Sequence, residues 1–525
     1  MKNTSQNDSL EDLKIREDLY ALEPRGPLLL LSGPGTGKTH DLARRVHWLL
    51  FERTPNVSPE NILVVTFTTE AAKNMRKRMS DKTKQNINTY VPPHEQPKVA
   101  TLHSLGHEII SRFGKEIALP QGLEVLPSGL IRDILLSDSA QLKDSKREKG
   151  KEVGLCRTNG DCKKDSSIKC SICDTYVKVL RTFNKIDHDD QIFEACKILN
   201  KSEIALKTYS AKAQHMLVDE YQDINQSQHN LIRLLTASQQ DGFFAVGDDD
   251  QSIYEFRGGS LKFIKEFENN YGKGTIRHKI LSRRCSRHIL SGSLDIVKKY
   301  NTGRLIGKPE TAAAEGGDPI LIHRFPTDVR ETEFIARLTK ARSKIMDVLI
   351  LVPNRFFASP LSSALVSLGI DHTSPFRSEK TDLGFVILLE HWLEKTEDSF
   401  ALRMIIERMI ESGYLGIPSA RTRKKEKLQA RESGLKTISD YWKPVLKKKQ
   451  TLLEAVNEKA ASNPIASSII RSISEIKRTR NMGLADYFRA LTRYFDIYHG
   501  TNDSMVQEMK RTLSQAEAFS GMAKI

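Results

Sequence analysis

Residues 27–39 have the sequence Pro-Leu-Leu-Leu-Leu-Ser-Gly-Pro-Gly-Thr-Gly-Lys-Thr, an apolar run followed at once by a glycine-rich loop. The run at 27–31 is short and continuous, which is typical of a strand buried on both faces of a parallel sheet. Beyond the loop, Leu42, Val46 and Leu49 recur at the spacing of one helix face. We therefore expect a strand, a loop and a helix in immediate succession.

The loop fits the phosphate-loop pattern G-x-x-x-x-G-K-[ST] with one change, since Ser32 stands at the first glycine. Its glycines let backbone N–H groups approach phosphate oxygens, Lys38 reaches the β- and γ-phosphates, and Thr39 can bind Mg²⁺. The loop thus predicts a nucleoside triphosphate and Mg²⁺ as ligands, and the resemblance described below implies that the nucleotide is ATP. The predicted nucleotide-binding residues of the loop are Gly33, Pro34, Gly35, Thr36, Gly37, Lys38 and Thr39.

Further short apolar runs, separated by helical stretches, predict an α/β fold with a mostly parallel sheet. These runs lie at 62–67, 216–218, 243–246, 320–322 and 348–352. Two cores follow from them, one ending near residue 280 and one beginning there. The segments 111–205 and 381–525 are charged and helix-rich, and we interpret both as inserted helical subdomains. The first core then comprises 1–110 and 206–280, and the second begins at 281–380.

Composition restricts the class of protein. The chain has 525 residues and a formal charge of +15 with a pI near 9.3, which favours a polyanion such as nucleic acid as partner. It has no apolar run of membrane-spanning length and no apolar signal core at its start, so we expect a cytoplasmic, nucleoid-associated protein with no membrane partner.

A carboxylate cluster, Asp219-Glu220-Tyr221-Gln222-Asp223, follows the apolar run at 216–218. Parallel α/β sheets bind ligands at the carboxyl ends of their strands. Asp219 is therefore predicted to contact Mg²⁺, and Glu220 to orient and deprotonate the attacking water.

The loop after the run at 243–246 combines two chemistries. Gln251 and Arg257 are polar groups able to contact a terminal phosphate, while Tyr254 and Phe256 offer ring faces on which unpaired bases can stack. Such a loop could transmit the state of the nucleotide to the grip on nucleic acid.

In these motifs, and in their order, the chain resembles superfamily 1 helicases of the UvrD/Rep group. Two further segments carry the resemblance, Val64 to Ala72 and Thr101 to Ser104. The resemblance implies RecA-like cores, the second incomplete. It also implies γ-phosphate contacts from Gln251 and Arg257. It places Thr66, Phe67, His103, Tyr254 and Phe256 on single-stranded DNA.

The segment Ser282-Arg283-Arg284-Cys285 corresponds to a family motif of the type Asn-Tyr-Arg-Ser, so the resemblance makes Arg284 a phosphate contact. Arg283 stands where the family has a tyrosine that stacks on adenine. The glutamine that the family has upstream of the phosphate loop has no counterpart in 13–22. Recognition of adenine is therefore left open.

The implied function is that of an ATP-dependent DNA helicase or translocase with 3′-to-5′ polarity, acting on single-stranded DNA and 3′-tailed duplexes in repair or recombination. Two later family segments, Thr-x-His-x-x-Lys-Gly-Leu-Glu and Ala-Leu-Thr-Arg-Ala, have no counterpart in the sequence; we interpret Ala490 to Arg493 as an accidental match. The alternative is therefore an ATP- and DNA-binding truncated or split subunit without turnover of its own, with a separate chain supplying the remainder.

Four cysteines, Cys156, Cys162, Cys170 and Cys173, lie within one charged stretch of the first inserted segment. Four thiolates suit tetrahedral Zn²⁺, which would fix a segment that lacks an apolar core. An iron–sulfur cluster and free thiols are the alternatives. The resemblance does not supply these cysteines.

Overall fold

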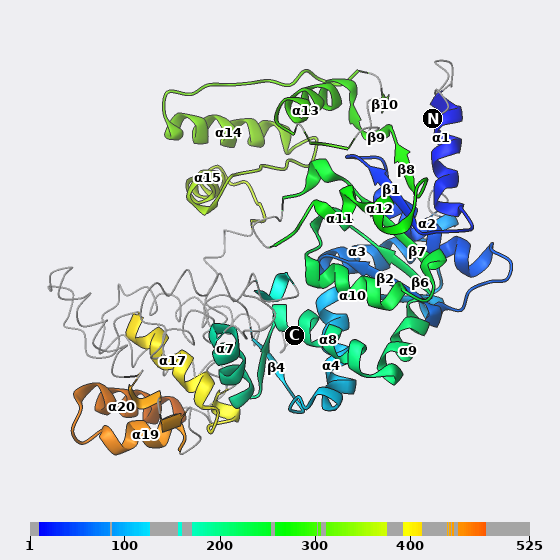
Figure 1. Ribbon diagram of the computed structural model, residues 1–525. Helices are drawn as coiled ribbons and strands as arrows, with labels where there is room; N and C mark the ends of the chain where they lie inside the picture. Colours follow the sequence, from blue (N-terminus) through cyan, green and yellow to red (C-terminus); the bar gives the residue numbers. More distant parts are fainter. Residues whose placement is uncertain are drawn as a thin grey trace, which may run out of the picture. The chain divides into compact units, whose positions relative to one another are not determined.

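The computed structural model describes residues 10–83, 87–126, 156–159, 171–253, 258–301, 303–305, 311–314, 316–374, 392–411, 438, 440–442, 444–445 and 450–478. The chain divides into two compact units, Met1–Leu321 and Ile322–Ile525. The first unit contains the predicted phosphate loop and is shown with its elements labelled in Figure 1.

The strands of the first unit are short. They are β1 (Leu28–Ser32), β2 (Ile62–Thr66), β3 (Lys98–Thr101), β4 (Glu124–Leu126), β5 (Lys185–Asp187), β6 (His215–Val218), β7 (Phe243–Gly247), β8 (Ile276–Lys279), β9 (Leu281–Ser286) and β10 (Thr311–Ala314).

Helices connect these strands in chain order. They are α1 (Leu10–Leu19), α2 (Lys38–Phe51), α3 (Thr69–Met79), α4 (Leu102–Phe113), α7 (Ser171–Thr182), α8 (His188–Lys201), α9 (Glu203–Lys212), α10 (Gln226–Thr236), α11 (Lys262–Lys265), α12 (Phe267–Tyr271) and α13 (Arg287–Tyr300).

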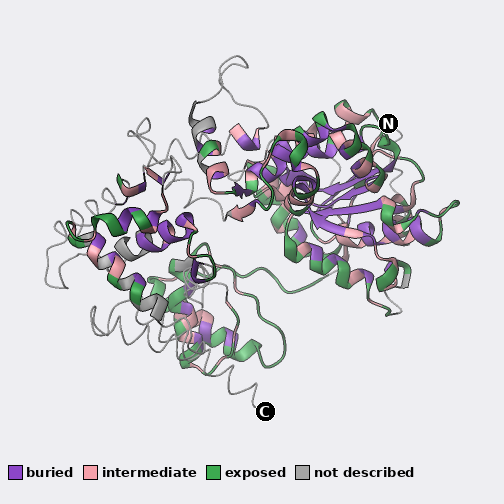
Figure 2. Cartoon of the chain, turned by 90° about the horizontal axis from the view of Figure 1, so that it is seen from below, coloured by how far each residue is buried: buried purple, intermediate pink, exposed green. Residues whose placement is uncertain are grey.

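Six strands form one parallel sheet in the order β3-β2-β6-β7-β1-β8. The four inner strands are buried along their whole length, which explains their continuous apolar sequences. Figure 2 shows this buried sheet in purple. The predicted α/β class and the four strands predicted for the first core are confirmed.

Successive residues of a strand point to opposite faces, and both faces are covered. Leu28 and Leu30 of β1 pack in a core with residues of α2 and α3. Leu29 and Leu31 pack on the other face with residues of α4, α8, α9, α10, α11 and α12. The sheet is therefore the middle layer of three.

The predicted first insertion is not purely helical. Its described residues include β4 and β5, which pair in parallel as a small separate sheet. Three residues in each strand are too few to give a recognisable apolar run, so the sequence did not reveal them.

The second unit is helical in its described residues. Its helices are α14 (Asp328–Arg342), α15 (Arg355–Ser367), α17 (Ser399–Glu411), α19 (Leu452–Lys459) and α20 (Pro464–Arg478). The predicted strands at 320–322 and 348–352 are wrong, because both runs are irregular and Ile322 and Leu351 are more than four-fifths exposed. A strand needs a hydrogen-bonded neighbour, and no described residue pairs with either run.

Among the described residues, no helix is both long and apolar enough to span a bilayer.

Candidate functional site

The phosphate loop connects the buried end of β1 to the first turn of α2. Gly35 and Gly37 have φ angles of 77° and 101°, a region that side chains disfavour. The Thr36 hydroxyl donates to the Gly33 carbonyl at 2.9 Å, and Lys38 Nζ donates to the Ser32 carbonyl at 3.3 Å. The loop is thus closed on itself, with the backbone N–H groups at the start of α2 available to an anion.

The carboxylate cluster begins where β6 ends. Asp219 is buried, and burial raises the pKa of its carboxyl to about 7, with Glu220 adding to the rise and Lys38 opposing it. Glu220 has a left-handed backbone with φ 49°, and its carboxylate lies 4.0 Å from Lys38 Nζ. The structure therefore brings together Lys38 and Glu220, which the sequence separates by more than 180 residues.

A Mg²⁺ ion fits the donor set at this place. Thr39 offers a hydroxyl and Asp219 a buried carboxylate, and Mg²⁺ takes oxygen ligands of these kinds. Burial is the main cause of the raised pKa of Asp219, and a cation bound beside it would stabilise the ionised carboxylate.

A chain of hydrogen bonds runs from Glu220 to the loop after β7. Gln222 Nε2 donates to Glu220 Oε2 at 2.8 Å, and Gln222 Oε1 accepts from the Asp248 N–H at 3.0 Å. Gln251 Nε2 in turn donates to Asp248 Oδ2 at 2.7 Å. Gln222 is almost fully buried, so its amide is a fixed link between the predicted catalytic carboxylate and Gln251.

The loop after β7 is also hydrogen-bonded to the carboxylate cluster through Ser252. Ser252 hydrogen-bonds to Asp223, although burial is the larger effect and raises the pKa of Asp223 to about 6. Tyr254, Phe256 and Arg257 lie outside the described residues, so their predicted roles stay predictions.

The predicted DNA contacts Thr66, Phe67 and His103 lie at the carboxyl ends of two neighbouring strands. Thr66 ends β2 and is paired in register with Thr101, the last residue of β3. Phe67 and His103 follow within two residues, and both are half-buried. These residues therefore gather at the same edge of the sheet as Asp219, with β6 directly beside β2.

His103 has a neighbour that the sequence did not indicate. Its ring meets the ring of His188 edge to face, with centroids 5.6 Å apart. Burial, with the neighbouring His188 acting in the same direction and Asp187 opposing it, lowers the pKa of His103 to about 4.

The segment with Arg283 and Arg284 forms β9 and lies against the phosphate loop. Ser282 Oγ donates to the Pro34 carbonyl at 2.9 Å, and the Arg283 N–H donates to the Gly35 carbonyl at 2.9 Å. A Cβ on Gly35 would lie 2.5 Å from the Arg284 Cβ, so only glycine permits this approach. The side chain of Arg284 is exposed beside the loop.

Arg283 forms an ion pair that sequence reasoning missed. Its Nη2 donates to Asp18 Oδ1 of α1 at 2.7 Å and lies 3.5 Å from the Lys14 carbonyl. Asp18 also acts on His40, in the first turn of α2. Burial and Arg78 lower the pKa of His40, and Asp18 raises it. No local pattern could reveal this pairing, because α1 and β9 are far apart in the sequence.

The cysteine cluster is only partly described. Cys156 is half-buried and Cys173 is buried on α7, while Cys162 and Cys170 lie outside the described residues. Within the described ranges, no group of three or more His, Cys, Asp or Glu side chains is placed to hold a metal ion. The structure therefore gives the predicted zinc or iron–sulfur site no support.

The residues next to this cluster are held by a buried ion-pair network. Asp190 lies 3.1 Å from Arg157 Nε and 3.0 Å from Arg181 Nη2. Asp187 caps α8 by accepting from the Asp190 N–H at 2.8 Å. These two carboxylates are thus engaged in ion pairing and in capping α8.

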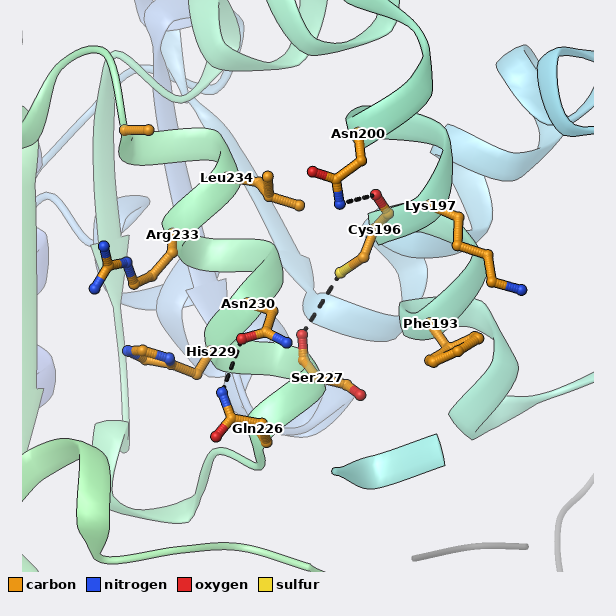
Figure 3. Close-up of a pocket in the computed structure, with 11 residues that line it drawn as sticks. Phe193, Cys196, Lys197, Asn200, Gln226, Ser227, His229, Asn230, Arg233 and Leu234 are labelled. Carbon is orange, nitrogen blue, oxygen red and sulfur yellow. Dashed lines mark hydrogen bonds between the residues drawn. The ribbon is translucent and has the colours of Figure 1, made fainter. Parts of the chain in front are cut away.

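A cavity of about 600 Å³ lies between α8 and α10 (Figure 3). Polar side chains such as Lys197, Asn200 and Arg233 contribute to its wall, together with Cys196. None of the predicted nucleotide-binding residues lines it, so it is separate from the phosphate-loop site.

Comparison with known proteins finds similarity to DNA helicases. The model of the UvrD/REP helicase N-terminal domain matches residues 15–272. ATP-dependent DNA helicase PcrA of Staphylococcus epidermidis is 30% identical over 331 residues, covering 59% of this chain and 43% of that protein. DNA helicase II of Haemophilus influenzae is 30% identical over 349 residues, covering 63% and 45% respectively. The chain thus spans less than half the length of these relatives.

Proposed function

The chain belongs, through its N-terminal domain, to the UvrD/Rep-like superfamily 1 helicases, and from this premise we propose that it is an ATP-dependent DNA helicase or translocase. The observation that carries the proposal is the approach of Lys38 to Glu220, 4.0 Å apart, across the ends of β1 and β6. A phosphate-binding lysine and a carboxylate able to activate water are the two groups that hydrolysis of a terminal phosphate requires.

In the proposed reaction the N–H groups at the start of α2 and the Lys38 ammonium bind the phosphates. Thr39 and Asp219 would hold Mg²⁺, which neutralises phosphate charge when bound. Glu220 orients the attacking water and accepts its proton. Arg284, exposed beside the loop, is proposed as a further phosphate contact, together with Gln251 and Arg257.

Coupling to DNA is proposed to follow the hydrogen-bond chain through Gln222. A change at the γ-phosphate would move Glu220 or Gln251. The hydrogen bonds of Gln222 and Asp248 would transmit this movement to the start of the loop that carries Tyr254 and Phe256. Thr66, Phe67 and His103 are proposed to line the same strand of DNA at the ends of β2 and β3.

The finer properties rest on the resemblance. We propose 3′-to-5′ movement on single-stranded DNA, a role in repair or recombination, and action on nucleoid DNA in the cytoplasm. A second candidate is an ATP- and DNA-binding subunit that needs a separate chain for turnover.

The test is ATP hydrolysis by the purified 525-residue chain, with and without single-stranded DNA. Lys38→Ala is expected to abolish hydrolysis, because it removes the ammonium that binds the β- and γ-phosphates. The matched control is Lys207→Ala, an exposed lysine that pairs with Glu203 one helical turn away. DNA-stimulated turnover that survives in Lys38→Ala contradicts the assignment, whereas ATP and DNA binding without turnover in the unmodified chain supports the subunit.

A further inference from the structure

The short helix Asp249–Gln251, which follows β7, is held by a segment that comes much later in the chain. Arg304 donates to the Asp250 carboxylate through two nitrogens, with Nη2 2.7 Å and Nε 3.1 Å from Oδ2. Asn301 Nδ2 donates to the other oxygen of the same carboxylate, Oδ1, at 2.9 Å. Both oxygens of Asp250 are thus bound by the residues that follow α13.

The surroundings of this ion pair are acidic and largely closed to water. The side chains of Arg304 and Asp250 are 15% and 9% exposed, and Asp248 and Asp249 are almost fully buried. The hydrogen bond to Asp250 is the main cause of a raised pKa of Arg304, and the charges of all three aspartates act in the same direction, while burial opposes them. A charge-assisted pair in such a place is stronger than one on the open surface.

The Arg304 segment is anchored to the phosphate loop. It follows α13, a helix of 14 residues that begins directly after β9 (Figure 1). Ser282 and Arg283 of β9 donate to carbonyl groups of the phosphate loop at 2.9 Å each. A helix of this length is a rigid element about 21 Å long. The contacts of Arg304 are therefore tied, through α13, to the loop that binds the phosphates.

Gln251 is the residue whose position these contacts set. It directly follows Asp250, and its Nε2 and its backbone N–H donate to Asp248 at 2.7 and 3.0 Å. The Asp250 N–H also donates to Asp248, at 3.0 Å. The short helix is thus closed at its beginning by Asp248, and its end is held through Asp250. Such support matters at a reacting group, because a misplacement of about 1 Å can cost about 100-fold in rate.

We infer that Arg304 is a positioning residue that holds Gln251 within reach of the terminal phosphate through the Asp250 carboxylate. The inference rests on the proposed function, because it takes from it the contact of Gln251 with the γ-phosphate. It adds the segment after α13 to the parts of the protein that respond to the third phosphate, by a route separate from the hydrogen bonds of Gln222.

Equilibrium binding of a diphosphate and a triphosphate tests this without requiring turnover. The dissociation constants of ADP and of the non-hydrolysable ATP analogue adenylyl imidodiphosphate are measured by titration calorimetry on the full chain with Mg²⁺. Arg304→Met keeps an unbranched side chain but removes the donors to Asp250. It is expected to weaken binding of the analogue relative to ADP by about fivefold, which is about 1 kcal/mol.

A milder variant keeps the test valid where Arg304→Met fails to fold. Asn301→Ala removes one hydrogen bond to Asp250 and leaves the ion pair in place. It is expected to weaken the analogue relative to ADP by about twofold. The matched control is Arg277→Met, because Arg277 also binds a carboxylate through Nε and Nη2, at 2.6 and 2.9 Å from the oxygens of Glu23. The ratio of the two dissociation constants should stay unchanged in this control.

Gln251→Ala distinguishes positioning from general support of the fold. If Arg304 acts through Gln251, adding Arg304→Met to Gln251→Ala leaves the ratio of the two dissociation constants unchanged. A merely structural role of Arg304 would weaken ADP and the analogue by the same factor, or would shift the ratio equally with and without Gln251. Either result overturns the inference.

The remaining outcomes separate the inference from the proposed function. An unchanged ratio in Asn301→Ala and in a folded Arg304→Met overturns the inference and leaves the proposed ATPase intact. A ratio that Gln251→Ala leaves unchanged removes the γ-phosphate contact of that residue and the inference with it. Binding of neither nucleotide to the unmodified chain overturns both proposals. The expected shifts in a chain that binds ATP without hydrolysing it support the inference and contradict turnover by this chain alone.

Discussion

Lys279 and Asp41 form a buried ion pair that locks α2 to the edge strand β8, and breaking it should destabilise the first unit. Lys279 Nζ lies 2.9 and 2.8 Å from the two Asp41 oxygens, and both side chains are 1% exposed. We predict that Lys279→Met, which keeps the length of the side chain but removes its charge, leaves Asp41 buried without a counter-charge.

The magnitude follows from the protonation of Asp41. Burial raises the pKa of its carboxyl from 3.8 to about 6, even though Lys279 lowers it. Below pH 6 both proteins hold the neutral acid, and the variant lacks the two hydrogen bonds, a loss of about 2 kcal/mol. Above pH 6 the wild-type carboxylate ionises beside Lys279, whereas the variant keeps its proton at a cost of about 1.4 kcal/mol for each pH unit. A carboxyl pKa above its unfolded value means that stability is lost as the pH rises, so the deficit reaches about 5 kcal/mol at pH 8.

The assay is urea unfolding followed by circular dichroism at pH 5 and pH 8. Arg277→Met is the control, because the Arg277–Glu23 pair is about one-third exposed and is expected to contribute about 1 kcal/mol or less. The double variant Asp41→Leu, Lys279→Met should recover most of the loss. Equal deficits at the two pH values, or a double variant no more stable than Lys279→Met, would refute the reasoning.

Three further variants test the site and its support. Gly35→Ala should destabilise the protein by about 1–3 kcal/mol and weaken nucleotide binding, because the added Cβ would collide with β9. The control Gly272→Ala, which also has a positive φ but open space around it, should keep nucleotide binding intact. Equal losses of binding in the two variants would contradict this. Gln222→Leu should lower the stimulation of ATP hydrolysis by DNA at least tenfold, with basal hydrolysis less affected. Gln226→Leu, which loses a hydrogen bond within α10, should leave this stimulation unchanged. Unchanged stimulation in Gln222→Leu would exclude coupling through the hydrogen-bond chain of Gln222. Gly106→Ala should lower the unfolding free energy despite the better helix propensity of alanine, because its Cβ would lie 2.6 Å from the Gln191 carbonyl oxygen of α8. A variant that is more stable than the wild type in thermal unfolding would show that α8 moves to accommodate the added methyl group.

The outer strands of the sheet could not be predicted from apolar runs in the sequence. β3 and β8 are edge strands, and polar residues such as Lys98 and His278 interrupt their apolar character. A strand with only one neighbour is less buried, so it needs no continuous apolar run. The runs at 320–322 and 348–352 failed in the opposite sense, since apolar character without a hydrogen-bonded neighbour does not make a strand.

The sequence by itself determined the parts of the protein that depend on neighbouring residues. The strand, glycine loop and helix at 27–51 follow from local sterics and apolar spacing, and so do the carboxylates placed at the end of β6. Tertiary structure alone decided the contacts between distant segments: Lys38 with Glu220, Gln222 with Asp248, and Arg283 with Asp18. These contacts depend on the order of strands in the sheet and on the docking of α1 against β9, which are set by packing over the whole core and leave no periodic trace in the chain.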